Sequence, residues 1–177
     1  MALANHYCHY AADFSFPGEA AQDLIGILRA LHGHQYGGEP KLPDWYALKY
    51  DLLEDGSVSP EKLGDHVQDM YLDGVSFPDL SYDEQEGIFY FGEDGSFPAD
   101  AIADVLADVK EEYGQREIVC FQVAYTSNRI ESGNFGGETF AVGPGVVKSK
   151  STGLLVDELA RMVEQELAEQ QDFVPKP

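Results

Sequence analysis

Basic residues are scarce in this chain of 177 residues, which has 11 lysines and arginines against 32 aspartates and glutamates. The resulting net charge of −21 repels nucleic-acid phosphates and anionic membrane surfaces, and it attracts basic partners. We therefore expect neither direct binding to nucleic acid nor binding to a membrane.

Cysteine is also scarce, because only Cys8 and Cys120 occur and they form no CxxC motif. This usage is typical of a reducing compartment and argues against a disulfide framework. No apolar run reaches the roughly 18–20 residues that span a bilayer, and the first residues lack the features of a secretory signal. These absences predict a cytoplasmic protein in which both cysteines are buried and unbonded.

Hydrophobic residues make up 44% of the chain and include ten Phe and ten Tyr, which is enough for a substantial core. We expect one domain over residues 1–177. The acidic, turn-rich segment 73–86 is the natural seam if the domain consists of two pseudo-repeat halves, 1–80 and 81–177.

Apolar residues alternate with polar or small ones over 119–125, turn residues follow at 131–134, and apolar residues return over 135–147. This pattern predicts a β-hairpin around which the fold is organised. Similar patterns predict further strands over 6–14, 45–53 and 88–91. Helical periodicity and capping residues predict helices over 15–33, 59–71, 96–113 and 152–170.

Residues 15–33 and 96–114 align without a gap and share a Ser-Phe-Pro start and a final glycine. Internal duplication and the general likeness of capped amphipathic helices both remain open as explanations. Either way, two βαβ-type units predict an α+β fold, specifically a ferredoxin-like sandwich with a mainly antiparallel sheet and helices on one face.

Two stretches, NHYCHYAADFSFPGEAAQDLIGIL and CFQVAYTSNRIESGNFGGETF, resemble the first strand–helix unit and the terminal hairpin of the YubB-type ferredoxin-like proteins of phages and plasmids. The resemblance covers about a third of the chain through its aromatic and glycine spacing, and residues 42–86 depart from the family's pattern. It implies a ferredoxin-like fold and a mobile-element origin. The family has no established activity, so no site residues are transferred.

Two loop patterns come close to ligand-binding motifs but lack essential residues. The glycine-rich run at 136–149 resembles a phosphate-binding loop, but Val147 replaces the glycine before Lys148. Residues 51–62 have the central glycine of a calcium loop, but Leu53 and Lys62 replace two of its oxygen ligands. We expect a strand in the first case and a turn in the second.

Metal-ligating residue types gather near the N-terminus, at positions His6, Cys8, His9, His32 and His34. Strand alternation points His6 and Cys8 away from His9, and no familiar zinc-finger spacing occurs. We expect no metal and no cofactor, although this group leaves metal binding open. No arrangement of nucleophile and base is apparent, so no catalytic residue is predicted.

The clearest functional signal is the acidic segment 51–113. It contains eighteen aspartates and glutamates but only two basic residues, Lys62 and Lys110, so it carries sixteen of the 21 excess negative charges. In the helix predicted over 96–113, helical spacing places the acidic residues on one stripe, opposite the apolar side. A carboxylate recurs about every 6 Å along this stripe, which is close to the phosphate spacing along a nucleic-acid strand. The predicted partner-binding residues are Asp83, Glu84, Glu93, Asp94, Asp100, Asp104, Asp108 and Glu111.

Three functions are compatible with this pattern. The first is a non-enzymatic acidic binding protein of phage or plasmid type, an inhibitor or nucleic-acid mimic directed against a basic, nucleic-acid-binding host defence protein. The second is a solvated acidic domain without mimicry. The third is an enzyme with an unrecognised site, which would show as a pocket with converging polar groups. Self-association as a homodimer is left open.

Overall fold

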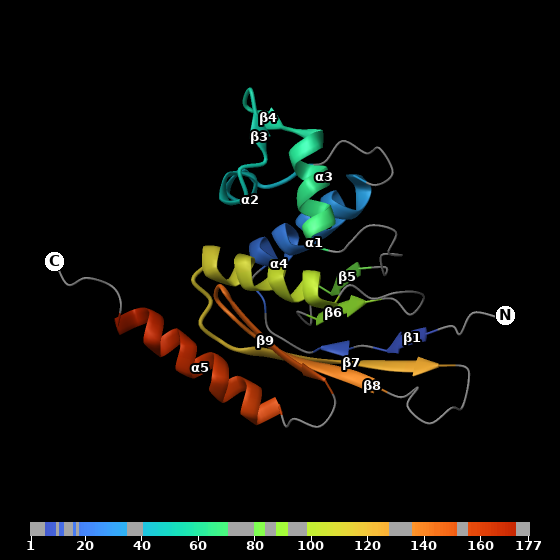
Figure 1. The fold of residues 1–177 in the computed structure, drawn as a ribbon, viewed down its shortest axis with the longest axis vertical. Helices are drawn as coiled ribbons and strands as arrows, with labels where there is room; N and C mark the ends of the chain where they lie inside the picture. The colour runs from blue at the N-terminus through green and yellow to red at the C-terminus, as the bar shows by residue number, and fades with distance from the viewer. Residues whose placement is uncertain are drawn as a thin grey trace.

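The structure is a computed structural model that describes residues 6–9, 11–12, 16, 18–34, 41–70, 80–83, 88–91, 99–127, 136–151 and 156–172. The helices are α1 (Gly18–His34), α2 (Asp44–Lys49), α3 (Pro60–Asp69), α4 (Ala99–Glu112) and α5 (Val156–Asp172). The strands are β1 (His6–His9), β2 (Ala11–Ala12), β3 (Leu53–Glu54), β4 (Ser57–Val58), β5 (Leu80–Asp83), β6 (Ile88–Phe91), β7 (Val119–Ser127), β8 (Gly136–Gly143) and β9 (Val146–Ser151) (Figure 1).

All strand pairs in the described residues are antiparallel, so the predicted α+β class is confirmed. One sheet has four strands in the order β1-β7-β8-β9, and a second has three in the order β2-β6-β5. The short hairpin β3-β4 stands apart with α2 and α3 (Figure 1). Strand β5 lies inside the segment predicted as an acidic seam, and its alternation was missed there.

The predicted hairpin is present, since β7 pairs with β8 from Val119↔Val142 to Tyr125↔Gly136. The return segment, however, is two strands instead of one, because the chain reverses again at Pro144 and Gly145. Gly145 has a φ of +65°, a conformation that glycine adopts without steric cost. The Pro-Gly pair is therefore a turn, and the single long strand predicted over 135–147 is wrong.

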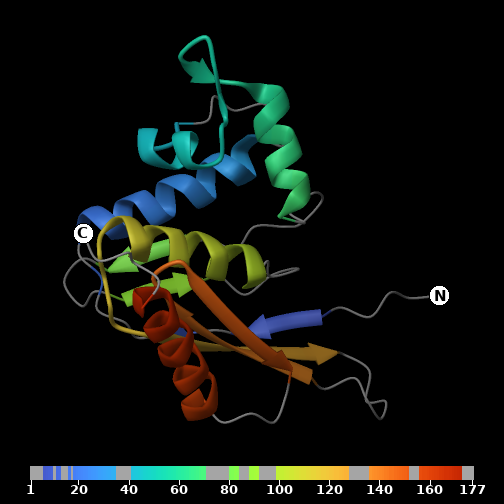
Figure 2. The ribbon, with the colours of Figure 1, turned by 60° about the vertical axis from the view of Figure 1, so that its left-hand side comes forward.

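Helices cover both faces of the four-stranded sheet, which corrects the prediction of helices on one face only. Val119, Phe121 and Val123 of β7 enter the main core with α4 and α1. The alternate residues Ile118 and Cys120 belong to a second cluster with Val163 and Leu167 of α5. Because side chains alternate across a strand, α5 lies on the face opposite α4 (Figures 1 and 2).

Helices α1 and α4 begin at equivalent positions of the sequence repeat, Gly18 and Ala99, and they pack against each other. Asp23 of α1 accepts hydrogen bonds from Trp45 Nε1 at 2.8 Å and from the Tyr113 hydroxyl at 3.0 Å, so one carboxylate joins three parts of the fold. Gly33 does not end α1 as predicted, because the helix continues to His34.

Residues 45–53 were predicted as a strand, but Asp44–Lys49 forms the helix α2. The Pro43 carbonyl accepts hydrogen bonds from the amides of Tyr46 and Ala47 at 3.0 and 3.1 Å. These two neighbouring residues are both buried, a pattern that a helix can produce and an alternating strand cannot. The following Asp55-Gly56 turn, with φ values of 50° and 80°, confirms the turn predicted within residues 51–62.

Candidate functional site

A cavity of about 370 Å³ lies where α3, the end of α2 and the β8–β9 turn meet α4. We call it the α4 cavity. Its walls are formed by Tyr50, His66, Asp69, Met70, Asp104, Ala107, Asp108, Gly145 and Val147. Five of these side chains are polar or charged, so the cavity has converging polar groups.

Helix α4 supplies the acidic wall through Asp104 and Asp108, and Glu111 follows them at helical spacing on the same side of the helix. The expectation that this stripe faces solvent is wrong for Asp108, which is only 7% exposed. The reason is tertiary: the C-terminal end of α2 lies over this side of α4 and covers Asp108. The Gly145 amide also donates a 3.0 Å hydrogen bond to the Ala107 carbonyl, which fixes the β8–β9 turn to α4.

Lys49 neutralises part of the stripe. Its ammonium group lies 2.9 Å from Oδ1 of Asp108 and 2.6 Å from Oε2 of Glu111. Burial lowers the pKa of Lys49, but the hydrogen bonds and charges of Glu111 and Asp108 outweigh it and raise the pKa above the usual value. Lys49 therefore stays charged and holds α2 against α4.

The rings of Tyr50 and His66 form the opposite wall, and the buried ring of Tyr46 packs against both of them. The Tyr46 hydroxyl and Nε2 of His66 share a hydrogen bond of 2.9 Å, and the rings of Tyr50 and His66 lie 4.4 Å apart with a tilt of 38°. Burial lowers the pKa of His66, although Asp108 and Asp69 oppose the change, so its imidazole is neutral at pH 7. Burial and the neighbouring negative charges raise the pKa values of Tyr46 and Tyr50, which keeps both hydroxyls protonated.

Asp104 is a cavity carboxyl group whose pKa lies close to neutral pH. The residue as a whole is exposed, but partial burial of its carboxyl group, together with the charges of Asp108 and Asp100, raises its pKa to about 6. No ion pair joins Asp104, Asp100 or Asp69 to a basic side chain among the described residues. Asp104 is thus a carboxylate at neutral pH without a cation of its own in that part of the chain.

The remaining predicted partner-binding residues are not gathered at the cavity. Asp100 is exposed in the first turn of α4, one turn before Asp104. Asp83 is half-buried on β5 and does not line the cavity. Glu84, Glu93 and Asp94 lie outside the described residues.

The sequence interpretation missed Lys49, Tyr50 and the α3 residues His66, Asp69 and Met70. A signal for α2 was present, since Pro43 followed by Asp44 is typical of a helix start. His66, Asp69 and Met70 also recur at helical spacing, which places them on one face of α3. Nothing in the sequence indicated that this face would meet the acidic side of α4.

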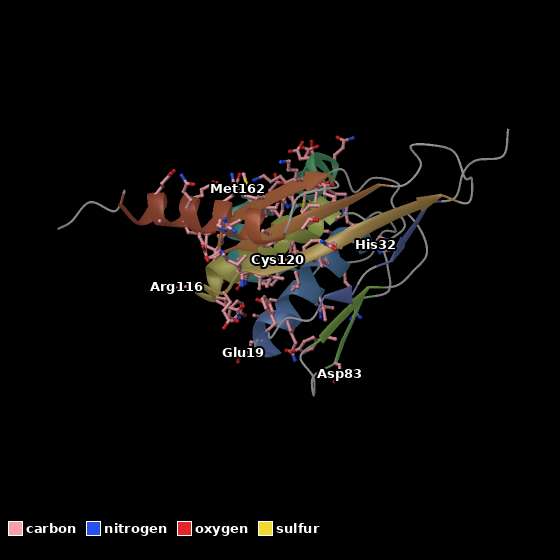
Figure 3. The ribbon with its side chains drawn as sticks, turned by 90° about the horizontal axis from the view of Figure 1, so that it is seen from below. Glu19, His32, Asp83, Arg116, Cys120 and Met162 are labelled. Carbon is pink, nitrogen blue, oxygen red and sulfur yellow. The ribbon has the colours of Figure 1, made fainter. Side chains whose placement is uncertain are left out.

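A second cavity, of about 560 Å³, lies beneath α5 on the far face of the sheet. Ile118, Cys120, Pro144, Leu167 and Ala168 form its apolar walls, and Arg116, Glu117 and Glu164 are its charged residues. Figure 3 shows Cys120 on the sheet beside α5, with Arg116 at the end of the preceding segment. The cysteine is half-buried, less than the full burial expected, because it lines this cavity.

The predicted histidine and cysteine group can be followed only in part. His32 and His34 end α1, whereas the side chains of His6, Cys8 and His9 lie outside the described residues, so the expected burial of Cys8 stays a prediction. Within the part of the chain that is described, no group of three His, Cys, Asp or Glu residues could hold a metal ion. No described helix combines the length and the hydropathy of a membrane span.

No protein-family model, no curated protein and no solved structure matches this chain.

Proposed function

We propose that this protein binds a basic macromolecular partner through the acidic side of α4, and that it acts as an inhibitor or nucleic-acid mimic toward a nucleic-acid-binding protein. The observation that carries the proposal is the contact of Lys49 with Asp108 and Glu111. An ammonium group of the chain itself already occupies one end of the stripe. Asp104 and Asp100 extend the stripe by one and two turns and hold no cation among the described residues.

Apolar surface beside the stripe supports the same proposal. Leu48 is 66% exposed and Tyr50 is 37% exposed, both next to Lys49. Charges at the rim of an interface mainly set the association rate and the specificity, whereas buried apolar and aromatic anchors supply most of the affinity. Leu48 and Tyr50 would be these anchors, with Asp100 and Asp104 steering the partner toward them.

The finer fold assignment is part of this proposal. We infer a ferredoxin-like core in which β1 and β2, separated by one residue, act as one strand between β7 and β6. The spatial order of this combined sheet is β7, β1/β2, β6, β5. Along the chain, α1 follows the strand β1/β2, and α4 precedes the strand β7. This arrangement supports the resemblance to the YubB-type proteins of phages and plasmids. Segment α2–α3, strands β8 and β9, and helix α5 would be additions to that core.

A charge-reversal experiment tests the binding function. The protein is immobilised, basic proteins are captured from a bacterial lysate at about 0.05 M salt, and the capture is repeated at about 0.5 M salt, where screening is strong. Asp100→Lys combined with Asp104→Lys should abolish capture, and double-stranded DNA should displace the captured protein from the unmodified chain. The matched control is Glu164→Lys combined with Glu169→Lys on α5, which changes the net charge equally on the other face of the sheet.

Equal loss of capture in both double variants would show that only net charge matters, which is the second function considered above, a solvated acidic domain. Failure of DNA to compete would remove the mimicry but not the binding.

An enzyme, the third function considered above, is a further candidate, because Asp104, His66 and Tyr50 converge on one cavity. With a pKa of about 6, Asp104 lies in the range that suits general acid–base catalysis near neutral pH. The variants His66→Gln and Tyr50→Phe separate the two candidates. They remove two of the polar groups that converge with Asp104, so they should sharply lower any proton-transfer activity of the cavity, but they leave the charge of the stripe, and therefore electrostatic capture, unchanged.

A further inference from the structure

The size of the α4 cavity limits what it can hold. Ligand-binding pockets generally range from about 300 to 1,000 Å³, and this cavity, at about 370 Å³, lies near the lower limit. Met70, Ala107 and Val147 give it apolar wall, against which a methylene chain can pack. These dimensions suit one long side chain better than a nucleotide or another large cofactor.

The charge of the cavity selects a cation. Asp104, Asp69 and Asp108 contribute carboxylates, and only Asp108 is paired with Lys49 among the described residues. Lys49, at the end of α2, pairs with both Asp108 and Glu111. The carboxylates of Asp104 and Asp69 therefore remain for a second cation. His66 is neutral at pH 7 and does not oppose this cation.

The aromatic wall distinguishes between the two kinds of cationic side chain. A guanidinium group is planar, stacks on aromatic faces and forms paired hydrogen bonds with a carboxylate. A lysine ammonium is a compact, strongly hydrated charge that gains less from such a wall. Tyr50, a residue that is 37% exposed and whose ring centroid lies 4.4 Å from that of His66, offers this stacking surface beside Asp104.

We infer that the α4 cavity receives one arginine side chain of the basic partner, with Asp104 as its counter-ion and the ring of Tyr50 as its stacking surface. This inference rests on the proposed binding function and names the chemistry of the group that the partner inserts. The arginine methylenes pack on Met70 and Val147, and the guanidinium group donates hydrogen bonds to the carboxylate of Asp104.

Arginine binding should depend on pH, because Asp104 can serve as the counter-ion only in its ionised form. Asp104 is surrounded by Asp100 and Asp108 from α4, by His66 and Asp69 from α3, and by Lys49 and Tyr50 from the end of α2. The β8–β9 turn adds Gly145 and Val147, which do not titrate. Binding should strengthen as the pH rises through about 6, where Asp104 loses its proton.

The test uses N-acetyl-arginine amide, whose only charge is the guanidinium group, and follows the protein by two-dimensional NMR. Millimolar probe at pH 7.5 should shift the signals of Tyr50, His66 and the Gly145 amide in a saturable manner. The citrulline analogue has the same shape without the charge and should bind at least about tenfold more weakly. The lysine analogue should also bind more weakly than the arginine probe.

Asp104→Asn should weaken arginine binding by about tenfold or more and remove its pH dependence between pH 5 and pH 7.5. The control Glu169→Gln removes one exposed charge from α5 and should leave binding unchanged. If Asp104→Asn is poorly folded, the pH titration of the unmodified protein tests the inference instead, because its arginine binding must still weaken below about pH 6.

Equal binding of the arginine and citrulline probes, or no saturable shift at the cavity residues, would overturn the inference. Lysate capture that depends on Asp100 and Asp104 without arginine binding would leave the proposed function intact and remove only the arginine pocket. Arginine binding without any capture would instead support the pocket and contradict the macromolecular partner.

Discussion

The hydroxyl group of Tyr50 donates a hydrogen bond of 2.5 Å to Oδ2 of Asp108. The other oxygen of this carboxylate accepts the ion pair from Lys49. Asp108 is therefore bound on both sides by residues at the end of α2, and it fastens α2 to α4. The most buried residue of the predicted partner-binding stripe has a structural role, and recognition is left to its more exposed neighbours.

This role predicts that Asp108→Asn lowers the free energy of unfolding by about 2 kcal/mol, because a hydrogen bond to a charged group contributes about 1.5–3 kcal/mol. Urea denaturation of Asp108→Asn, Tyr50→Phe and the double variant measures the coupling between the two side chains. We expect a coupling of about 1–2 kcal/mol. Additive effects of the two substitutions would show that the hydrogen bond contributes nothing to stability.

Asp104 should make the stability of the protein depend on pH. Its pKa is about 6 in the folded protein and about 3.9 in an unfolded chain. Well below pH 4 the group is protonated in both states. As the pH rises from about 4 to about 6, the unfolded chain loses this proton while the folded protein still holds it, so the fold loses stability. Asp104→Asn should therefore match the unmodified protein near pH 4 and exceed it in thermal stability at pH 7.5. Equal stability of the two proteins at both pH values would contradict the raised pKa.

Two glycines should respond in opposite ways to replacement by alanine. Gly145 has a φ of +65°, and an added Cβ would lie 3.1 Å from the Glu111 carboxyl group. Gly145→Ala should cost about 1–2 kcal/mol, the strain of a left-handed residue. Gly26 lies within α1 and has no atom near its added Cβ, so Gly26→Ala should raise stability by about 0.5–1 kcal/mol. Thermal denaturation of both variants checks the contrast.

Close packing of α5 on the sheet should make Gly143 sensitive to any side chain. An added Cβ would lie 2.8 Å from Cγ1 of Val163 and 3.1 Å from Cδ1 of Leu167. Gly143→Ala should lower the free energy of unfolding by about 1–3 kcal/mol through overpacking.

Val163→Ala removes the closest of these contacts. The double variant should therefore be less destabilised than the sum of the single variants, by more than about 0.5 kcal/mol. Strict additivity in urea denaturation would mean that α5 does not pack on Gly143.

The local pattern of apolar, polar and turn residues was sufficient to predict much of the secondary structure. The alternation over 119–125 lies within β7, the Asp55-Gly56 turn lies where it was expected, and Ser59 precedes α3 as predicted. These elements depend on interactions between residues close in sequence, so their signal is contained in a short window. The errors at α2, at β5 and at Pro144-Gly145 occur in short segments, where few residues define a period.

The sequence by itself determined the strong acidity, the position of the acidic side of α4 and the α+β class, because composition and periodicity are properties of the chain alone. Only the tertiary structure decided which carboxylates are available to a partner. It buried Asp108 under Lys49 and Tyr50, left Asp104 exposed beside His66, and formed an open cavity between helices that are distant in sequence. It also buried Lys110, whose ammonium lies 5.9 Å from the centre of the Phe16 ring. The physical reason is that burial and pKa depend on which segments pack together, and no periodicity within one helix records its neighbours.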